Sequence, residues 1–273
     1  MSTQAAERVV SLTCSNTEIV CALGCGDRLV GIDDYSDYPP EVVAGLPRVG
    51  PDLGVDVDKV AAVEPDLVLA SLTVPGHEKV VAAVERAELP FVAPAPERLS
   101  DVYQDIEEIA ALLGVPERGA EVVARMRAEL APVDPDPRHE RPTIAVQWWP
   151  KPSILPGGRS WVTDLIDLAG GRNPIGDEAV LSRPVPDEEL AALDPDAIVL
   201  SWCGVEEDKY RPSVVYENPV LATTRAVRNR AVRPITEAYL GRPSPRLIEG
   251  YRALKKLVNE FVGQRRKRDE SLT

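Results

Sequence analysis

Residues 100–130 read SDVYQDIEEIAALLGVPERGAEVVARMRAEL and carry a helical pattern along their whole length. Apolar residues recur there at three- and four-residue spacing, which predicts two consecutive amphipathic helices. The two apolar stripes consist of Val102, Ile106, Ile109 and Leu113, then Val122, Val123, Met126 and Leu130. Ser100 is the expected N-cap of the first helix, Gly114 its end, and Pro116 the first position of the second helix. The pattern predicts a helical bridge, residues 99–131, between two lobes.

A second pattern occurs once on each side of this bridge. Residues 60–71 read VAAVEPDLVLAS, and residues 190–201 read LAALDPDAIVLS. Each combines a helix end, an acid-Pro-Asp turn and a continuous apolar run, which is typical of a strand in a parallel sheet covered on both faces. The sequence therefore predicts two α/β lobes, residues 1–98 and 132–273, with parallel-type sheets. Two lobes joined by a bridging helix would hold a ligand in the cleft between them.

Other elements follow from local pattern. Strands are expected at 9–12, 29–32, 89–92, 143–149 and 231–235, and helices at 77–87, 161–168 and around 220–227. Ser160 suits the N-cap of the helix at 161–168. Ser244 and Pro245 suit the start of the last helix, and residues 150–158, which are rich in proline and glycine, are expected to form a loop.

The composition excludes several classes of function. The 273 residues are 44% hydrophobic and 27% charged, which is typical of a globular protein. The net charge of −13 argues against nucleic acid as a partner, because phosphate contacts need a basic surface. No apolar stretch is long enough to insert into a membrane. We expect a monomer that binds a small molecule. It would be cytoplasmic because no signal segment is visible, or periplasmic or extracellular if a leader has been removed.

Motifs for catalysis and for metal binding are absent from the sequence. It contains no G-x-x-x-x-G-K, H-E-x-x-H or G-x-S-x-G motif. Its two histidines rule out a histidine-rich metal centre, and Cys21 and Cys25 are expected to be buried thiols rather than metal ligands. We therefore expect no enzymatic activity, no resident metal and no covalent cofactor.

Two cysteines and several aromatic residues follow predicted strands. Cys14 and Cys203 lie just beyond the carboxyl end of a strand, one in each lobe, where open α/β sheets bind ligands. Either thiol lines the wall of the cleft or contacts the ligand directly. Aromatic residues in comparable loops would form a stacking surface for a flat ligand, although a tryptophan there is alternatively a core residue. These aromatic residues are Tyr35, Tyr38, Trp149, Trp202 and Tyr239.

Short motifs also occur in a characteristic order along the chain. They are RVVSL at 8–12 with SNTE at 15–18, YSDYP at 35–39, EPDLVL at 64–69, AGGRN at 169–173 and SPR at 244–246. Together they resemble the class III substrate-binding proteins of ABC transporters, particularly the vitamin B12-binding branch. The resemblance implies two lobes bridged by a helix and non-catalytic binding of a ligand for import. The implied ligand is a corrinoid such as cobalamin, or another tetrapyrrole or metal chelate such as haem.

The resemblance also implies which residues line the cleft. Tyr35 and Tyr239 match aromatic contacts of the vitamin B12-binding branch, and Cys14 and Ser15 occupy its first-loop contact. The implied ligand-binding residues are Cys14, Ser15, Tyr35, Asp52, Ser71, Trp149, Ile154, Trp202, Tyr239 and Arg246.

The chain departs from that branch at several of these positions. Where the branch has a more aromatic cage, this chain has Ser71, Ser182 and Ile154. Asp52 or Pro51 replaces a tryptophan, and Trp149 and Trp202 are expected to compensate from neighbouring positions. These departures keep a related corrinoid, haem or another metal chelate open as the ligand.

The family docks on its permease through one glutamate per lobe, and Glu78 and Glu188 stand at those positions. Both would also suit the first turn of a helix, where the helix dipole favours acidic residues whatever their role. Two other functions remain open. One is a cytosolic sensor or carrier of the same ligand. The other is an enzyme with Cys14 or Cys203 as nucleophile, although no histidine is placed to activate either thiol.

Overall fold

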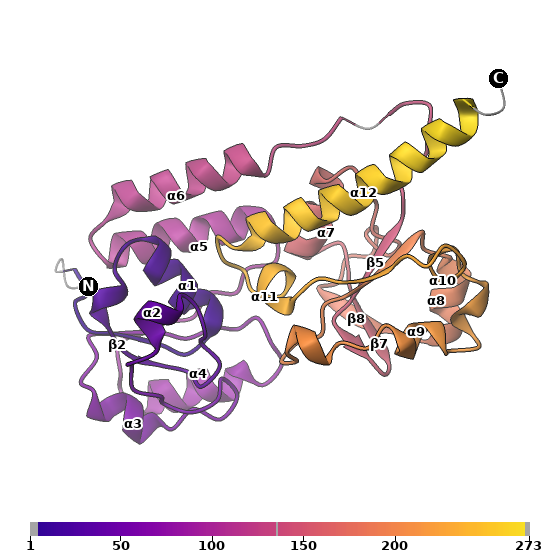
Figure 1. The fold of residues 1–273 in the computed structure, drawn as a ribbon. Coiled ribbons are helices and arrows are strands. Elements are labelled where there is room, and N and C mark those ends of the chain that lie inside the picture. The colour runs from indigo at the N-terminus through magenta and orange to yellow at the C-terminus, as the bar shows by residue number, and fades with distance from the viewer. Residues whose placement is uncertain (1–4, 135, 271–273) are drawn as a thin grey trace. The chain divides into compact units, whose positions relative to one another are not determined.

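The computed structural model describes residues 5–134 and 136–270, which form two compact units. Unit 1 comprises Met1–Ala128 and Pro243–Pro245, and unit 2 comprises Glu129–Arg242 and Arg246–Thr273. Each unit contains a parallel sheet with helices packed around it (Figure 1). The predicted class, two α/β lobes with parallel sheets, is confirmed.

Unit 1 is built on a four-stranded parallel sheet in the order β2-β1-β3-β4. The strands are β1 Val9–Ser11, β2 Leu29–Ile32, β3 Leu67–Leu69 and β4 Phe91–Val92. All residues of β1 and β3 are buried, because helices cover both faces of the sheet and leave no solvent-facing side. The strand order reverses between β1 and β3, since the chain first adds β2 on one side of β1 and later adds β3 on the other.

The helices of unit 1 are α1 Cys14–Ala22, α2 Pro40–Val43, α3 Val57–Ala62, α4 His77–Arg86, α5 Leu99–Leu112 and α6 Pro116–Glu129. The predicted pair of helices is α5 and α6, and Pro116 begins α6 as expected. The two helices pack closely at Gly119, where an added Cβ would lie 2.5 Å from the Cβ of Ala110. α6 then leads the chain to the first residue of unit 2.

The predicted N-cap of α5 was wrong. The helix begins at Leu99 with Arg98 as its N-cap residue, so Ser100 lies inside the first turn. Asp101 Oδ2 accepts hydrogen bonds from the backbone N–H groups of Arg98, at 2.8 Å, and Glu97, at 3.0 Å. A carboxylate that satisfies two N–H groups at once stabilises this start more than a single hydroxyl at Ser100 would.

The burial of Asp105 on α5 can be tested by its effect on stability. Its carboxyl lines a cavity of about 120 Å³ beside the residues that follow β4. Burial, together with repulsion from Glu108 and Asp101, raises the pKa of Asp105 from 3.8 to about 7. Because the folded state then holds a proton that the unfolded state releases, this group costs increasing stability as the pH rises from about 4 to above 7.

The Asp105→Asn variant is therefore expected to melt about 2–4 °C above the wild type at pH 8, with little difference near pH 4. Thermal unfolding at both pH values measures this. Glu107→Gln, an exposed site on the same helix, is the control and is expected to show no such pH dependence. An equal difference at both pH values would contradict the burial of the Asp105 carboxylate.

Unit 2 contains two sheets. The first is parallel, in the order β10-β9-β5, with β5 Ile144–Gln147, β9 Ala197–Leu200 and β10 Val232–Pro234. The second is antiparallel, in the order β6-β7-β8, with β6 Trp149–Pro150, β7 Ser153–Pro156 and β8 Ser182–Val185. The proline and glycine residues at 150–158 predicted a loop where β6 and β7 lie. That prediction was wrong because Pro150 and Pro156 stand at strand ends, where proline is compatible with a strand.

The helices of unit 2 are α7 Trp161–Leu168, α8 Asp187–Leu193, α9 Ser213–Tyr216, α10 Arg225–Arg228, α11 Glu237–Leu240 and α12 Leu247–Glu270. The bounds of α7 and its N-cap are confirmed, since Ser160 Oγ accepts from Val162 N at 3.3 Å. The helix expected around 220–227 is instead a 3₁₀ turn, Leu221–Thr223, followed by α10.

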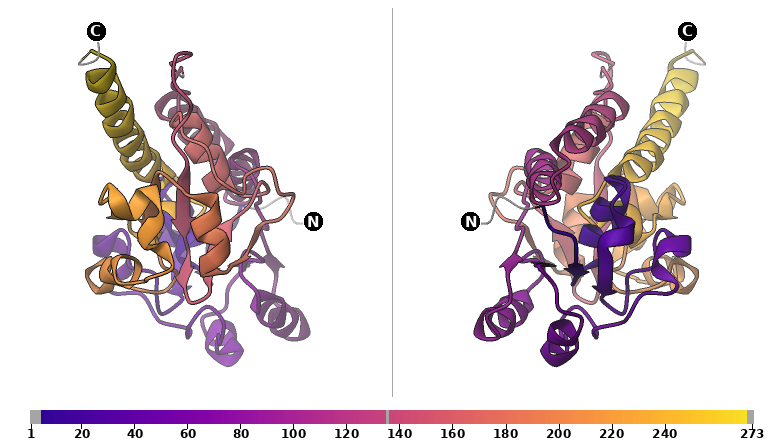
Figure 2. Two further views of the ribbon diagram at one scale, coloured as in Figure 1. Left: turned by 90° about the vertical axis from the view of Figure 1, so that its right-hand side faces the viewer. Right: turned by 90° about the vertical axis from the view of Figure 1, so that its left-hand side faces the viewer.

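The long helix α12 packs against α7 and α11 within unit 2 (Figures 1 and 2). The predicted N-cap at Ser244 was wrong, because α12 begins at Leu247. Ser244 belongs to unit 1, where its hydroxyl donates to Glu18 Oε2 at 2.5 Å and both side chains are buried. None of the helices in the described residues is long and apolar enough to cross a membrane.

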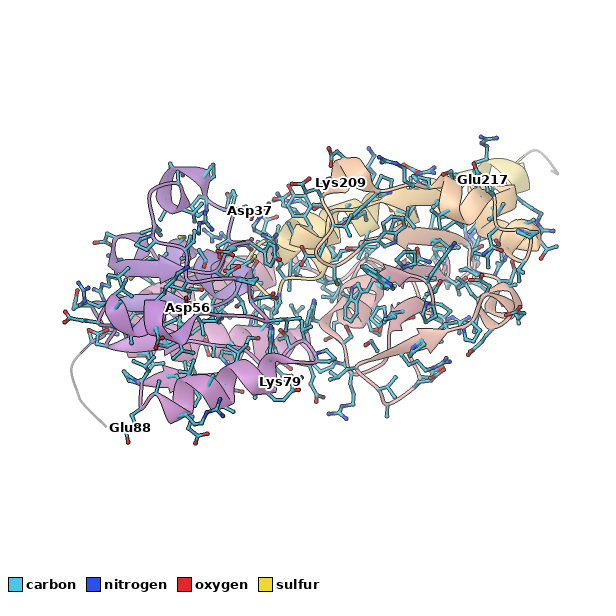
Figure 3. All side chains as sticks on the ribbon, turned by 90° about the horizontal axis from the view of Figure 1, so that it is seen from below. Asp37, Asp56, Lys79, Glu88, Lys209 and Glu217 are labelled. Atoms are coloured by element: carbon cyan, nitrogen blue, oxygen red, sulfur yellow. The ribbon has the colours of Figure 1, made fainter. Side chains whose placement is uncertain are left out.

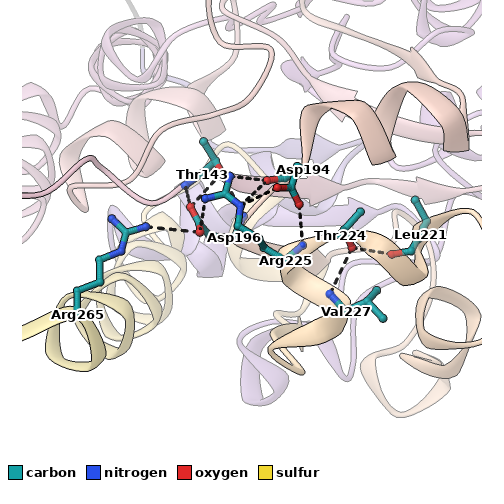
Figure 4. Close-up of polar contacts among 8 residues, drawn as sticks. All are labelled: Thr143, Asp194, Asp196, Leu221, Thr224, Arg225, Val227 and Arg265. Atoms are coloured by element: carbon teal, nitrogen blue, oxygen red, sulfur yellow. Dashed lines mark hydrogen bonds and ion pairs between the residues drawn. The ribbon is translucent and has the colours of Figure 1, made fainter. Parts of the chain in front are cut away.

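The two acid-Pro-Asp turns hold the sheets together in the same way. In unit 1, the Asp66 carboxylate accepts from the backbone N–H groups of Glu7 and Arg8, both at 2.9 Å. In unit 2, Asp196 Oδ2 accepts from Thr143 N at 2.8 Å, just before β5 (Figure 4). Each aspartate thus ties the start of one strand to the start of its neighbour in the sheet.

In unit 2, the aspartates of this turn also form ion pairs with arginine side chains. Arg225 Nη1 donates to Asp196 Oδ1 at 2.8 Å, and Arg225 Nε donates to Asp194 Oδ2 at 2.9 Å. Arg265 Nη2, on α12, lies 3.5 Å from the same Asp196 oxygen (Figure 4). The turn therefore joins β5, β9, α10 and α12 through one buried carboxylate.

Candidate functional site

The reversal of strand order in unit 1 marks a place for a ligand. In open α/β sheets, ligands bind beyond the carboxyl ends of the strands at such a reversal, which here means the loops after β1 and β3. Asn16, in the first turn of α1, donates from Nδ2 to Ala70 O at 2.7 Å. This bond ties the segment with Cys14 and Ser15 to the segment with Ser71, so the structure brings these three predicted residues together.

Two of these three residues offer little surface to a ligand. Ser15 and Ser71 are buried, and their hydroxyls pair with those of Thr13, at 3.2 Å, and Thr73, at 2.9 Å. Cys14 is half-buried. The loop after β3 instead exposes Leu72 and Val74, which the sequence analysis did not select. Their signal was an apolar loop directly after a buried strand.

The loop after β2 presents two tyrosines on a fixed backbone. Tyr35 is 57% exposed and Tyr38 is 45% exposed. Asp33, which is fully buried, accepts at Oδ1 from Tyr35 N at 2.8 Å and at Oδ2 from Ser36 Oγ. The thiol of Cys14 also points to Asp33 Oδ1, with its sulfur 3.9 Å away. Asp33 therefore brings Cys14 and Tyr35 together, a role that the sequence alone did not reveal.

Asp52 lies in a third loop, residues 50–54, which is bonded to the tyrosine loop because Asp34 N donates to Gly50 O at 2.9 Å. Its carboxylate is 3.6 Å from His77 Nε2, and His77 Nδ1 accepts from Val74 N at 3.3 Å. Beside it, Leu53 is half exposed and packs over Gly76, where an added Cβ would lie 3.1 Å from a Leu53 methyl group.

All of these loops expose apolar side chains at the carboxyl ends of the strands. We call the five exposed side chains the apolar surface of unit 1, which consists of Tyr35, Tyr38, Leu53, Leu72 and Val74. Ligands of open α/β sheets bind at this edge of the sheet, so these exposed side chains are the candidate ligand contacts of unit 1.

Unit 2 brings two predicted residues together on its antiparallel sheet. Trp149 on β6 lies directly opposite Ile154 on β7, and Ile154 lies opposite Pro184 on β8. Directly opposite residues share one face of a sheet, so the three side chains form an apolar strip. Trp149 is 43% exposed. Ser182 lies two positions before Pro184 on β8.

Trp202 belongs to the core of unit 2. Its ring is 6% exposed and lies 5.3 Å from the ring of Tyr210, and its Nε1 donates to Gln147 Oε1 at 2.9 Å. The alternative of a core residue therefore fits Trp202, and its ring keeps almost no surface for a ligand. Cys203, the next residue, is exposed.

Tyr239 and Arg246 lie against each other in unit 2. The Arg246 guanidinium carbon is 5.0 Å from the centre of the Tyr239 ring, which is a cation–π arrangement. The arginine thereby covers one face of a ring that was predicted to stack on the ligand.

The two glutamates predicted for docking are exposed, each in the first turn of its helix. Glu78 lies in α4, and backbone hydrogen bonds from its own N–H and from Gly76 N hold the pKa of its carboxyl below the ordinary range. Glu188 lies in the first turn of α8 with two other acidic residues. Both positions agree with the simple helix-dipole explanation as well as with docking.

Cysteine, histidine and acidic side chains are the residues that could hold a metal ion. Within residues 5–134 and 136–270, no three histidine, cysteine or acidic side chains are grouped so that they could hold an ion. Burial, with Glu18 and Glu41 nearby, raises the pKa of Cys21 to about 11, which keeps it a neutral thiol.

The comparisons with known proteins agree with this fold. The family model described as periplasmic binding protein matches residues 9–239. A vitamin B12-binding protein of Vibrio parahaemolyticus is 26% identical over 269 residues, which cover 98% of this chain and 94% of that protein. An ABC transporter substrate-binding lipoprotein of Bacillus subtilis is 27% identical over 259 residues. The match covers 92% of this chain and 80% of that lipoprotein.

A solved structure extends the comparison to three dimensions. The apo form of a periplasmic heme-binding protein from Roseiflexus sp. RS-1 superposes with a TM-score of 0.77 at 28% identity. The match covers 94% of this chain and 99% of that one. Because the family model spans most of the sequence and the fold agrees, this chain belongs to the periplasmic binding protein family.

Proposed function

We propose that this protein is a non-catalytic substrate-binding protein of ABC-type import that takes a flat metal chelate, either a corrinoid such as cobalamin or a haem-like tetrapyrrole. The apolar surface of unit 1 carries this proposal. Two exposed tyrosines and three exposed aliphatic side chains stand beyond the carboxyl ends of its strands. The named relatives, which bind vitamin B12 and heme, support the choice of ligand class.

A macrocycle suits this surface for physical reasons. Exposed aromatic and aliphatic side chains gain free energy when a flat apolar ligand covers them, and aromatic stacking adds about 0.5–1.5 kcal/mol per pair. The hydrogen bonds from Tyr35 N and Ser36 to Asp33 fix the tyrosine loop before the ligand arrives. A pre-ordered loop lowers the entropic cost of binding.

The surroundings of Cys14 and His77 in the same loops do not favour catalysis. The thiol of Cys14 is half-buried and is directed at Asp33 Oδ1. His77 is buried and accepts from the Val74 backbone, so it does not activate Cys14. We therefore propose binding without a reaction, at an extracytoplasmic location, as the names of the relatives indicate.

Titration calorimetry of the purified protein with cobalamin, cobinamide and haemin tests the proposal. At least one of the three is expected to bind at a 1:1 ratio with a Kd of about 1 μM or below, which corresponds to about 8 kcal/mol. Absorption spectra recorded alongside show whether the metal keeps its own ligands. Lack of saturable binding to all three would overturn the proposed ligand class.

We also propose that Glu78 and Glu188 contact a permease, as the family resemblance implies. Exposed ion pairs contribute only about 0–1 kcal/mol each, so docking is expected to be weak and salt-sensitive. The double variant Glu78→Lys/Glu188→Lys is expected to lose pull-down by a permease encoded nearby. Glu88→Lys/Glu217→Lys makes the same charge change at two other exposed glutamates (Figure 3) and is the control. Equal recovery of both variants would make Glu78 and Glu188 ordinary surface charges.

A further inference from the structure

The buried histidine His77 holds the loop that follows β3. It is the first residue of α4 and is only 3% exposed. Its ring nitrogen Nδ1 accepts from Val74 N at 3.3 Å, and its own backbone N–H donates to Val74 O at 3.1 Å. Val74 and Leu72 are the members of the apolar surface of unit 1 that lie in this loop. The ring of His77 therefore fixes part of the proposed ligand surface.

The hydrogen bond from Val74 also fixes the proton on the neutral ring. Because Nδ1 accepts, the neutral ring carries its proton on Nε2. Nε2 is buried and has no hydrogen-bond partner within residues 5–134 and 136–270. The Asp52 oxygen Oδ2 lies 3.6 Å from Nε2, just beyond hydrogen-bond distance. The neutral ring thus satisfies Val74 N and leaves its own N–H group without an acceptor.

A second proton on the ring would reverse this arrangement. Both ring nitrogens of a protonated histidine are donors, so Nδ1 no longer accepts from Val74 N. Two N–H groups would then face each other across the 3.3 Å between these nitrogens. At the other end of the ring, the positive charge would attract the Asp52 carboxylate. Protonation therefore exchanges the bond to the loop for an ion pair with Asp52.

The charged groups that interact with the ring in the described part of the chain lie on two segments. Asp52, in the loop at 50–54, is one-third exposed and favours the protonated ring. On α4 itself, Glu78 attracts the same positive charge, and Lys79 in turn attracts Glu78. Burial of the ring and its place at the N-terminal end of α4 oppose the charge.

We infer that protonation of His77 releases the loop after β3 and weakens the binding of a ligand to the apolar surface of unit 1. The effect on the ligand rests on the proposed function, whereas the release of the loop does not. A ligand that covers Leu72 and Val74 needs the loop in place, so it binds the protein with a neutral ring more tightly. The affinity therefore falls when a lower pH protonates His77.

Nuclear magnetic resonance of the ligand-free protein tests the release of the loop, because the chain contains only two histidines. Between about pH 8 and 5.5, the ring of His77 is expected to change from a proton on Nε2 alone to protons on both nitrogens. The Val74 amide signal is expected to shift with the same midpoint. The titration of His139, which lies in unit 2, is expected to leave that signal unchanged.

Two results of this titration would overturn the inference. One is a His77 ring that stays neutral over the whole pH range. The other is a Val74 amide signal that does not follow the protonation of His77.

Two substitutions separate the loss of the acceptor from the gain of charge. The side-chain oxygen of asparagine accepts a hydrogen bond but is not protonated in this pH range, so His77→Asn is expected to keep the bond from Val74 N throughout. Phenylalanine has no acceptor, so His77→Phe is expected to lose the bond at every pH. At one pH, the Val74 amide is expected to exchange its hydrogen at least about tenfold faster in His77→Phe than in His77→Asn. Equal exchange rates would show that the ring does not hold the loop.

Calorimetry with cobinamide, or with haemin if cobinamide does not bind, tests the effect on the ligand. From about pH 8 to 5.5, the affinity of the wild type is expected to fall about threefold to tenfold more than that of His77→Asn in the same buffers. This comparison removes any titration of the ligand and of Asp105, whose pKa is raised to about 7. His139→Asn is the matched control and is expected to keep the pH dependence of the wild type.

The outcomes separate this inference from the proposed function. If a ligand binds with the same pH dependence in the wild type and in His77→Asn, the effect of His77 on the ligand is overturned while the binding function stands. If neither cobinamide nor haemin binds, the proposed function fails, and the Val74 amide signal still decides whether His77 controls the loop.

Discussion

Replacing Asp196 by alanine is expected to lower the free energy of unfolding of unit 2 by about 2–4 kcal/mol. The Asp196 carboxylate is 5% exposed and accepts from the backbone and the hydroxyl of Thr143, itself buried. Removing the carboxylate leaves the Thr143 N–H buried without its acceptor. It also removes one of the two carboxylates that pair with Arg225 (Figure 4).

The chain offers both a selective probe and a matched control for this prediction. All four tryptophans lie in unit 2, so tryptophan fluorescence during urea unfolding reports that unit. Asp66→Ala removes the equivalent turn aspartate in unit 1, which is less buried, and is expected to cost only about 1 kcal/mol by circular dichroism. An unchanged fluorescence midpoint for Asp196→Ala would show that the buried turn is dispensable.

The Tyr35→Ala variant is expected to weaken the binding of cobinamide by about tenfold to a hundredfold, which equals about 1.4–2.8 kcal/mol. The ring of Tyr35 is the most exposed of the apolar surface of unit 1, and its loss removes both stacking and apolar burial. The backbone bond from Tyr35 N to Asp33 survives the substitution, so the loop is expected to keep its conformation.

Tyr103→Ala provides the control, because this tyrosine lies on α5 and its ring faces Arg127 on α6, whose guanidinium carbon is 5.1 Å from the ring centre. Equal Kd values for wild type, Tyr35→Ala and Tyr103→Ala would remove Tyr35 from the binding surface. Circular dichroism of each variant confirms that the fold is retained.

The sequence predicted the parallel sheets because their signals are local. The acid-Pro-Asp turns at residues 64–66 and 194–196 each precede a strand, and a fully buried strand must be apolar at every position. The bounds of α7 were equally clear, since Ser160 is a cap followed directly by an amphipathic helix. The two predicted N-caps at Ser100 and Ser244 were wrong because a carboxylate is involved at each position. At the start of α5, Asp101 accepts the backbone hydrogen bonds in place of Ser100. The Ser244 hydroxyl donates to Glu18 and does not cap α12.

The candidate site was less predictable than the fold. Aromatic residue type selected Tyr35 and Trp149, which are exposed, together with Trp202, which fills the core of unit 2. Exposure depends on which neighbours a side chain meets in three dimensions, and the sequence pattern does not contain that information. Asp33 was missed for the same reason, because a buried carboxylate that organises a loop looks like any other turn residue.

The bond between Ser244 and Glu18 makes unit 1 discontinuous in the chain. A gene fragment that ends at Ala128 encodes every strand of unit 1 but not the hydroxyl that donates to the buried Glu18 carboxylate. On the ribosome, residues 5–128 emerge well before Ser244 does, so unit 1 gains this buried hydrogen bond only after residues 129–242 have been synthesised. Until then, the buried Glu18 carboxylate does not have the hydrogen bond from Ser244 Oγ.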